Sequence, residues 1–251
     1  MNIIYEIIAA LQFLTRLNIS QRLVLPETLG RSVRHFPLVG AVIGLVLAVV
    51  AQIPAEYIPV RVLAVVLLGL ELVVTGGMHI DGLMDTFDGI FSGRSRERML
   101  EIMKDSRVGA YGVMGFGLFI LLKWSLLTEI LPSPSFTGLF VMPVLGRLGI
   151  VIAITGFPYG RESGLGKVFS QHAGRGALYA AIIWTLIFTL PFGKIAVFCL
   201  IIAVGFAILF ARYVCKVLGG LTGDVYGAVL ELTEVVALLT FMLFHGCRGV
   251  L

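Results

Sequence analysis

Three aspartates, Asp81, Asp85 and Asp88, follow a long apolar stretch at spacings of four and three residues. On a helix their side chains lie within about 60° of one another, and the apolar residues between them point to the opposite side. Three neighbouring carboxylates repel one another unless a cation neutralises them, and hard oxygen ligands favour Mg²⁺. We therefore predict that these aspartates bind Mg²⁺; the alternative is an ordinary solvated helix face.

A run of basic residues comes directly after the aspartates and contains Arg94, Arg98, Lys104 and Arg107. Guanidinium groups form paired hydrogen bonds with phosphate oxygens, and a lysine adds a point charge. Phosphoryl transfer needs cations beside a metal site, because catalysis there depends on positioning the group and spreading its charge. We predict that these residues bind a substrate phosphate; the alternative for any single one is anchoring to anionic lipid.

A second acidic group lies near the C-terminus. Asp224 and Glu231 are seven residues apart and share a helix face, and Glu231 and Glu234 lie well inside an apolar stretch. Carboxylates at that depth are costly, so they indicate either a functional site or a buried partner. Arg147, in mid-span, is the candidate partner, and Glu71 competes for it. We also count Arg147 among the candidate substrate-binding residues.

Two residues of these segments have a second interpretation. His79 lies on the far side of its helix from the three aspartates, so it is as much a candidate for orienting a neighbour or carrying a proton as for binding metal. The segment Thr222-Gly-Asp224 is also typical of a helix N-terminus, so the alternative to a catalytic role for Asp224 is a structural role as a helix cap.

Helices must position these residues, because 58% of the 251 residues are hydrophobic, only 14% are charged, and the mean hydropathy is +1.00. A soluble domain does not have this composition. We expect an all-α, polytopic helical membrane protein that forms a single integral membrane catalytic domain over residues 1–251, with about seven transmembrane helices. The predicted spans are 36–53, 60–78, 110–131, 136–157, 177–191, 194–213 and 227–245.

The first residues predict an amphipathic helix that lies on the membrane surface. Glu6 falls away from its apolar side, which consists of Ile4, Ile7, Ile8, Leu11 and Leu14. With the N-terminus inside the cell, most of the 19 Lys and Arg residues fall in cytoplasmic loops, as the positive-inside rule requires. Lys123 is expected near an outer end, and the long charged loops all face the cytoplasm.

Three segments resemble the signature regions of the cobalamin synthase family, also called adenosylcobinamide-GDP ribazoletransferases. They are HIDGLMDTFDGIFSGRSRERMLEIMKDSRVGAYG, RESGLG at residues 161–166, and LGGLTGDVYGAVLELTE. The resemblance implies transfer of the adenosylcobinamide phosphate group from adenosylcobinamide-GDP to α-ribazole or its 5'-phosphate, which yields adenosylcobalamin or its phosphate and GMP. It also implies a place in the cytoplasmic (inner) membrane of a prokaryote.

Taken together, these lines give a mechanistic hypothesis in which Mg²⁺ is the cofactor and bridges the diphosphate. A ribose hydroxyl attacks the phosphorus nearer cobinamide, and Asp224 or Glu231 receives its proton, with His79 as the reserve candidate. The basic run stabilises the departing GMP. The expected partners are the corrinoid nucleotide, the riboside and the lipid membrane, with no nucleic acid; the sequence leaves the oligomeric state open.

Alternative functions remain at this point. A prenyltransferase also carries two aspartate-rich motifs, but its second motif is richer in aspartate than this one. CDP-alcohol phosphotransferases run similar chemistry on a different aspartate spacing, so the likeness is only an analogy. An ion-coupled transporter holds buried carboxylates too, but it spreads polar residues toward both membrane faces. A non-catalytic scaffold has no need of converging aspartates.

Overall fold

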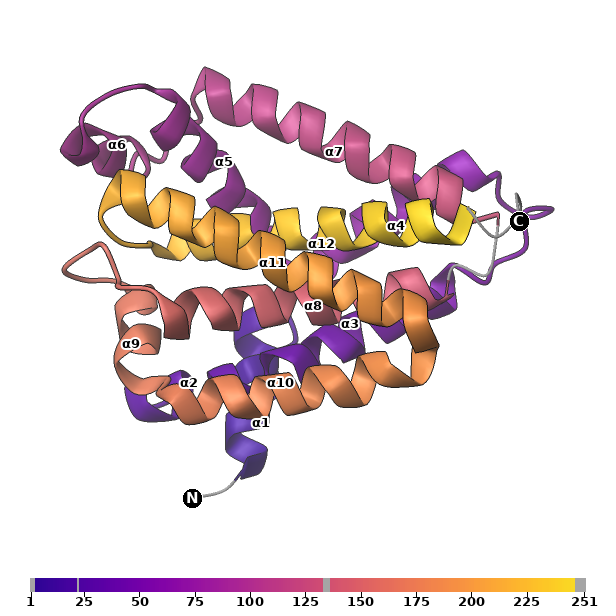
Figure 1. The fold of residues 1–251 in the computed structure, drawn as a ribbon, viewed down its shortest axis with the longest axis horizontal. Helices are drawn as coiled ribbons and strands as arrows, with labels where there is room; N and C mark the ends of the chain where they lie inside the picture. The colour runs from indigo at the N-terminus through magenta and orange to yellow at the C-terminus, as the bar shows by residue number, and fades with distance from the viewer. Residues whose placement is uncertain (1–2, 22, 133–135, 247–251) are drawn as a thin grey trace.

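The computed structural model describes residues 3–21, 23–132 and 136–246, and they form an almost entirely helical bundle (Figure 1). Within these ranges no strand occurs, only one isolated bridge between Tyr159 and Leu221. This confirms the all-α prediction. The elements are α1 Ile3–Leu14, α2 Pro26–Ser32, η1 Val33–His35, α3 Phe36–Val50, α4 Val60–Thr75, α5 Met78–Phe91, α6 Arg96–Ile102, α7 Ala110–Ile130, α8 Phe136–Gly156, α9 Leu165–His172, α10 Arg175–Thr189, η2 Leu190–Phe192, α11 Gly193–Leu218 and α12 Gly223–Gly246.

All seven predicted spans coincide with helices, but the predicted number of membrane crossings is not confirmed. Five segments of the described chain are long and apolar enough to cross a membrane, and a sixth is added if the bent pair α4–α5 counts as one. The difference arises because α4, with 16 residues, is short for a crossing on its own, and because α10 and α11 are counted together as the one segment 175–218. The five segments are 26–50, 110–130, 136–156, 175–218 and 223–244.

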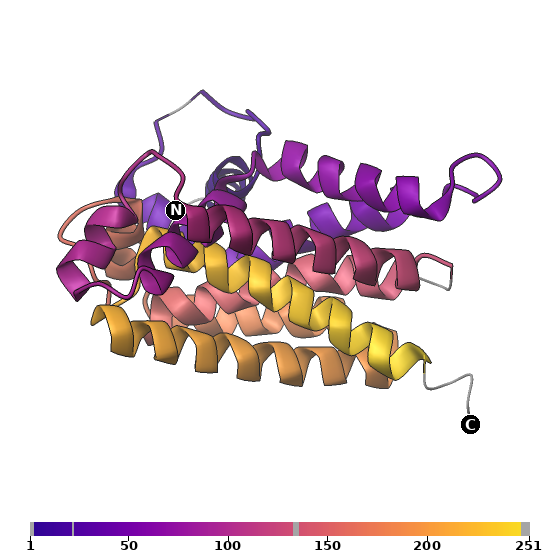
Figure 2. The ribbon, with the colours of Figure 1, turned by 90° about the horizontal axis from the view of Figure 1, so that it is seen from above.

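The centre of the bundle is α8, most of whose residues are buried. Helices α3, α10, α11 and α12 pack against it. Figure 1 shows the chain reversing at η2, so that α10 and α11 run in opposite directions. Figure 2 shows a row of neighbouring helices in which α4 lies beside α7, α7 beside α12, and α12 beside α11. The membrane-crossing helices thus form a scaffold that leaves α5, α6 and α9 gathered at one end of the bundle (Figure 1).

A sharp bend separates α4 from α5. Gly76 and Gly77 have φ values of 70° and 72°, a region that glycine adopts without steric cost, and the two helix axes meet at 94°. The backbone N–H of Arg16 donates to the carbonyl of Val74 at 2.8 Å, which ties the segment after α1 to this bend. The bend directs α5 along α12 instead of continuing the line of α4.

Two single charged residues lie inside the bundle, and for the second the expectation is wrong. Glu6 is buried beside Arg34 and His35, at 3.7 and 3.5 Å, while Ile4 is exposed. Lys123 does not lie near an outer end but is only 1% exposed in the bundle interior. In both cases an ion-pair partner from another helix holds the charge inside, and no property of the residue's own helix reveals that partner.

Candidate active site

The candidate site forms where the first turns of α5 and α12 cross. A Cβ atom on Gly82 would lie 2.7 Å from the carbonyl oxygen of Asp224, and one on Gly227 would lie 2.8 Å from that of His79. Only glycine permits so close a crossing. It brings two acidic segments, distant in sequence, within electrostatic reach: Asp85 interacts with both Asp81 and Asp224.

Arg161 completes this group from the loop between α8 and α9. Its Nη2 atom lies 2.7 Å from a carboxylate oxygen of Asp224. The loop is fixed on the start of α12 by two backbone hydrogen bonds, Gly160 N–H to Leu221 C=O at 2.7 Å and Leu221 N–H to Pro158 C=O at 2.8 Å. Arg161 is not among the site residues predicted from the sequence, although it begins the RESGLG segment, because its pairing with Asp224 depends on contacts across the fold.

The cap of α12 is Thr222 and not Asp224. The Thr222 hydroxyl accepts the Val225 N–H at 3.4 Å and lies 3.2 Å from the Asp224 carboxylate. The Asp224 side chain is thereby left facing Arg161 and the neighbouring cavity. The modest interpretation of Asp224 as a helix cap is therefore wrong.

Asp88 is held differently from the other two aspartates of α5. It is buried, and its two carboxylate oxygens accept the backbone N–H groups of Gly109 and Gly112 at 2.8 and 2.7 Å. These N–H groups belong to the first turn of α7, where no helical partner is available and where a negative charge is favoured. Asp88 therefore fixes the start of α7, whereas no ion pair within the described chain reaches Asp81 or Asp85.

Two cavities meet at Asp81. The first, which we call the α1 cavity, measures about 650 Å³ and lies between the end of α1 and the α4–α5 bend; its lining includes Gln12, Arg16 and Asn18. The second, the α12 cavity, measures about 390 Å³ and is lined by parts of α5, α8, α9 and α12 and by the loop that carries Arg161. Asp81 belongs to the lining of both.

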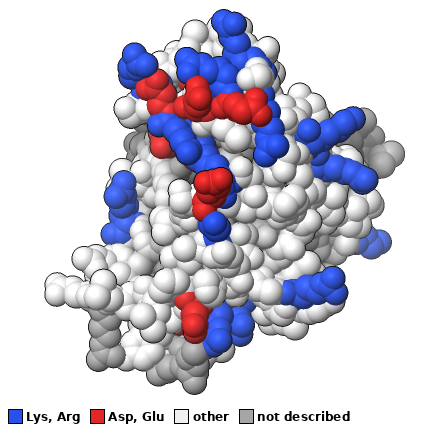
Figure 3. Space-filling model, turned by 90° about the vertical axis from the view of Figure 1, so that its left-hand side faces the viewer, with Lys and Arg blue, Asp and Glu red and all other residues white. Residues whose placement is uncertain are grey.

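The four basic residues after α5 are not equivalent. Lys104 lines the α12 cavity. Arg98 and Arg107 are exposed and contact Glu101 and Asp105, each at 2.7 Å. Hydrogen bonds from Arg107 lower the pKa of Asp105 to about 2, so this carboxyl stays ionised. Arg94 is exposed before α6. Figure 3 shows acidic and basic side chains gathered on this end of the bundle.

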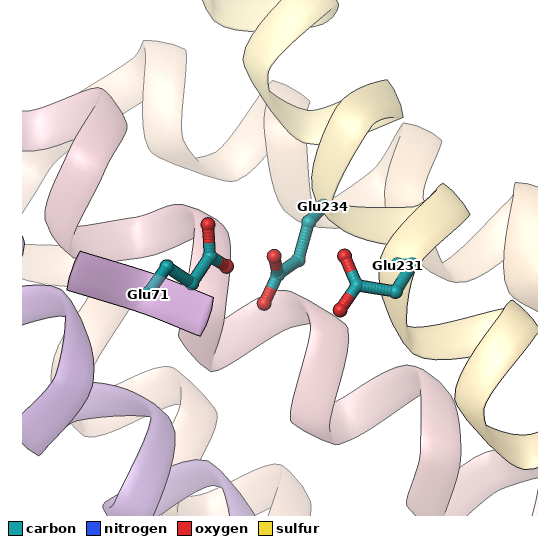
Figure 4. Close-up of side chains that lie close together, drawn as sticks. All are labelled: Glu71, Glu231 and Glu234. Atoms are coloured by element: carbon teal, nitrogen blue, oxygen red, sulfur yellow. The ribbon is translucent and has the colours of Figure 1, made fainter. Parts of the chain in front are cut away.

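Glu231 and Arg147 lie elsewhere, in a buried ion cluster inside the bundle. Figure 4 shows three glutamates from α4 and α12 whose carboxylates converge. The Nζ atom of Lys123, from α7, lies 2.9 Å from Glu71, 2.8 Å from Glu234 and 3.4 Å from Glu231. Arg147, from α8, pairs with Glu234. One carboxylate oxygen from each glutamate lies within 4.8 Å of those from the other two, and the cation that they share, Lys123, belongs to the protein itself.

His79 lies between this ion cluster and the α12 cavity. It is 2% exposed and lines the cavity, and neither ring nitrogen has a hydrogen-bond partner among the described residues. The charges of Arg147, Glu234 and Lys123 all act on it. The structure thus places the ring in the wall of the cavity that Asp81 and Asp224 also line.

The residues at the crossing fit a divalent metal ion. Asp81, Asp85 and Asp224 offer hard carboxylate oxygens that act on one another electrostatically, and the first two have no cation in contact within the described part of the chain. Mg²⁺ is bound through one or two carboxylates and keeps its other positions for water and phosphate oxygens. In contrast, each of the three glutamates of the buried cluster already contacts Lys123.

The fold and the site together define an integral membrane protein whose charged, ligand-sized cavities lie at one end of a helical bundle. The sequence model of the cobalamin-5-phosphate synthase family matches residues 6–242, and the chain belongs to this family. It is accordingly a membrane transferase of cobalamin biosynthesis.

Named relatives are similar to this chain over nearly its whole length. The adenosylcobinamide-GDP ribazoletransferase of Desulfitobacterium hafniense is 42% identical over 243 residues, which cover 92% of this chain and 93% of the relative. The enzyme of the same name from Alkaliphilus metalliredigens is 36% identical over 239 residues, with 95% of each chain covered. No solved structure matches this one.

Proposed function

We propose that this protein transfers the adenosylcobinamide phosphate group from adenosylcobinamide-GDP to α-ribazole or its 5'-phosphate, with release of GMP. Family membership and the names of the relatives support the reaction. The observation that carries the assignment of the site is the crossing of α5 and α12, which brings Asp81 and Asp85 together with Asp224 beside Arg161. Nothing in the comparisons favours a prenyltransferase or a transporter.

The cofactor in this proposal is Mg²⁺, held by Asp81 and Asp85, with Asp224 facing the same space. Both carboxylate oxygens of Asp88 accept backbone N–H groups of Gly109 and Gly112, so Asp88 would bind the ion only through its remaining lone pairs. When bound, the ion neutralises the diphosphate and makes its phosphorus easier to attack. Lys104 and Arg161 line the α12 cavity, as Asp81 and Asp224 do, and add positive charge for phosphate oxygens.

The protein's own part in the reaction is to position groups and to accept one proton. A ribose hydroxyl attacks the phosphorus attached to cobinamide, the bond from that phosphorus to the GMP oxygen breaks, and the hydroxyl proton passes to a base. Asp224 is the proposed base, because its carboxylate lines the cavity and is held in place by Arg161. His79, unpartnered in the same cavity wall, is the reserve candidate, and Arg94, Arg98 and Arg107 remain candidates for holding GMP.

Glu231 is not the proposed base, because Lys123 contacts it inside the bundle and it is absent from the lining of both cavities. We place the active site on the cytoplasmic face of a prokaryotic inner membrane. The charged side chains gather at one end of the bundle (Figure 3). This supports the cytoplasmic face, because cytoplasmic loops of membrane proteins are the ones rich in Lys and Arg.

The test is GMP release from membranes given adenosylcobinamide-GDP, α-ribazole and Mg²⁺. The wild type is expected to release GMP only with the metal present, and Asp85→Asn is expected to lower the rate by about 10³-fold. Asp105→Asn is the matched control: it removes the same charge from an exposed loop nearby. Absence of product from the wild type contradicts the proposed reaction, and full activity of Asp85→Asn contradicts the metal site.

A further inference from the structure

The two cavities that meet at Asp81 differ in what they offer a ligand. The α1 cavity is lined largely by polar side chains and backbone around the α4–α5 bend. The α12 cavity is smaller, and its walls include buried apolar side chains of α8 and α9: Ile150, Ile154 and Phe169. Asp81 lines both cavities, together with Phe13 and Met78. One cavity therefore suits a large polar molecule, and the other suits a small, partly apolar one.

Size separates the two substrates of the proposed reaction. A volume of about 390 Å³ lies in the range of small-molecule sites, roughly 300–1,000 Å³. A corrin ring that carries an adenosyl group and a GDP tail is much larger than this cavity and can extend only its diphosphate as far as Asp81. A riboside with a flat bicyclic base fits inside. Size alone thus assigns the smaller substrate to the α12 cavity.

Unpartnered polar atoms in the same cavity point to a ligand that carries both aromatic and polar groups. The hydroxyl of Tyr226, both ring nitrogens of His79 and the Nε atom of Arg161 are buried and have no hydrogen-bond partner among the described residues. Such groups cost about 1–3 kcal/mol each when nothing satisfies them. The Tyr226 ring also lies beside that of Tyr159, with centroids 6.2 Å apart. Burial raises the pKa of the Tyr159 phenol, so it remains a neutral hydroxyl.

We propose that the α12 cavity binds the riboside acceptor, with its apolar base against Ile154 and Phe169 and its polar atoms at Tyr226 and His79. The ribose hydroxyl then reaches Asp224 at the junction of the cavities. The diphosphate donor approaches from the α1 cavity, so that donor and acceptor meet at Asp81 without sharing a pocket. This assignment rests on the proposed function, and it names Tyr226 as a residue that determines specificity for the acceptor.

The binding experiment uses α-ribazole alone, without the corrinoid and without Mg²⁺, on the purified full-length protein in detergent or nanodiscs. The wild type is expected to bind it, and adding adenosylcobinamide-GDP without Mg²⁺ is expected not to displace it. Ile154→Trp fills the cavity and is expected to weaken binding at least tenfold. Ile152→Trp is the control on the same helix, because Ile152 faces the groove between α10 and α11.

A second variant covers the case in which Ile154→Trp does not fold. Tyr226→Phe keeps the ring and removes only the hydroxyl, so it is expected to raise the KM for α-ribazole about fivefold, the effect of one hydrogen bond, with little change in the KM for the corrinoid nucleotide. Unchanged α-ribazole affinity in Tyr226→Phe and in folded Ile154→Trp overturns the assignment, and so does displacement by the corrinoid nucleotide. A wild type that binds α-ribazole but releases no GMP contradicts the proposed reaction and leaves the cavity assignment standing.

Discussion

Two groups of charged residues in this protein have similar compositions and opposite surroundings. In the buried cluster, three glutamates share Lys123 and Arg147, and every carboxylate contacts a cation (Figure 4). At the α5–α12 crossing, aspartates outnumber the cations in contact with them, and the two cavities reach Asp81 and Asp224. Every carboxylate of the first group already contacts a cation, whereas Asp81 and Asp85 of the second have none in contact within the described chain, so a metal ion or a proton can balance their charge.

The difference shows why depth in the membrane is an ambiguous sign of function. Buried carboxylates usually mark a site, but here they join α4, α7, α8 and α12 through ion pairs. The cluster also supports the site indirectly, because its charges act on His79 in the cavity wall. We therefore assign stability to the buried cluster and catalysis to the crossing, and the two assignments can be tested separately.

The largest effect is expected at the crossing. Asp224→Asn removes the proposed proton acceptor and the charge that Arg161 faces, so GMP release is expected to fall by about 10²–10⁴-fold, with little change in the amount of folded protein. Glu162→Gln changes the same charge on an exposed position of the adjoining loop and serves as the control. Equal losses in both variants would mean that the overall charge of the loop matters more than Asp224.

The next largest effect is expected on stability. Lys123→Met leaves three buried carboxylates with only Arg147 as a partner, which costs about 3–5 kcal/mol of unfolding free energy. The measurement is reversible unfolding in mixed detergent micelles, with Lys194→Met as an exposed control. The protein that remains folded is expected to release GMP at close to the wild-type rate. A variant of normal stability and no activity would move Lys123 into the catalytic site and end the distinction between the two groups.

The sequence predicted the helices well and the contacts between them poorly. Every predicted span coincides with a helix, because apolar stretches of that length have few other structures in a membrane. The aspartate face of α5 followed from helical periodicity. Lys123 and Arg161 were misplaced or missed because their partners come from other helices and loops, and periodicity within one segment carries no information about packing partners. The short length of α4 and the counting of α10 and α11 as one segment left the number of crossings unresolved.

Asp88 stands between the two groups, since it belongs to the aspartate face but has both oxygens bound by α7. A Cβ atom at Gly112 would lie 2.4 Å from its carboxylate, so Gly112→Ala must displace that side chain. The expected loss is about 2 kcal/mol of unfolding free energy, the scale of a hydrogen bond to a charged group. Gly117→Ala, on the same helix with open space around it, is expected to leave stability unchanged or slightly raised. A higher Mg²⁺ requirement in Gly112→Ala would show that Asp88 also serves the metal.

The smallest effect is expected at Arg98, on the exposed rim of the site. Its side chain is 64% exposed and already contacts Glu101, and exposed ion pairs add little to stability. Arg98→Gln is therefore expected to leave unfolding unchanged and to raise the KM for the corrinoid nucleotide about threefold in low salt, where long-range attraction of a phosphate is least screened. The effect is expected to disappear at high salt.

Lys104→Gln, which changes a residue in the cavity wall, is expected to raise the KM for the corrinoid nucleotide at either salt concentration, because a contact inside a cavity is screened much less than one on the rim. If Arg98→Gln instead lowers kcat at all salt concentrations, the guanidinium contacts the reacting phosphate, and the site extends beyond the crossing to include α6.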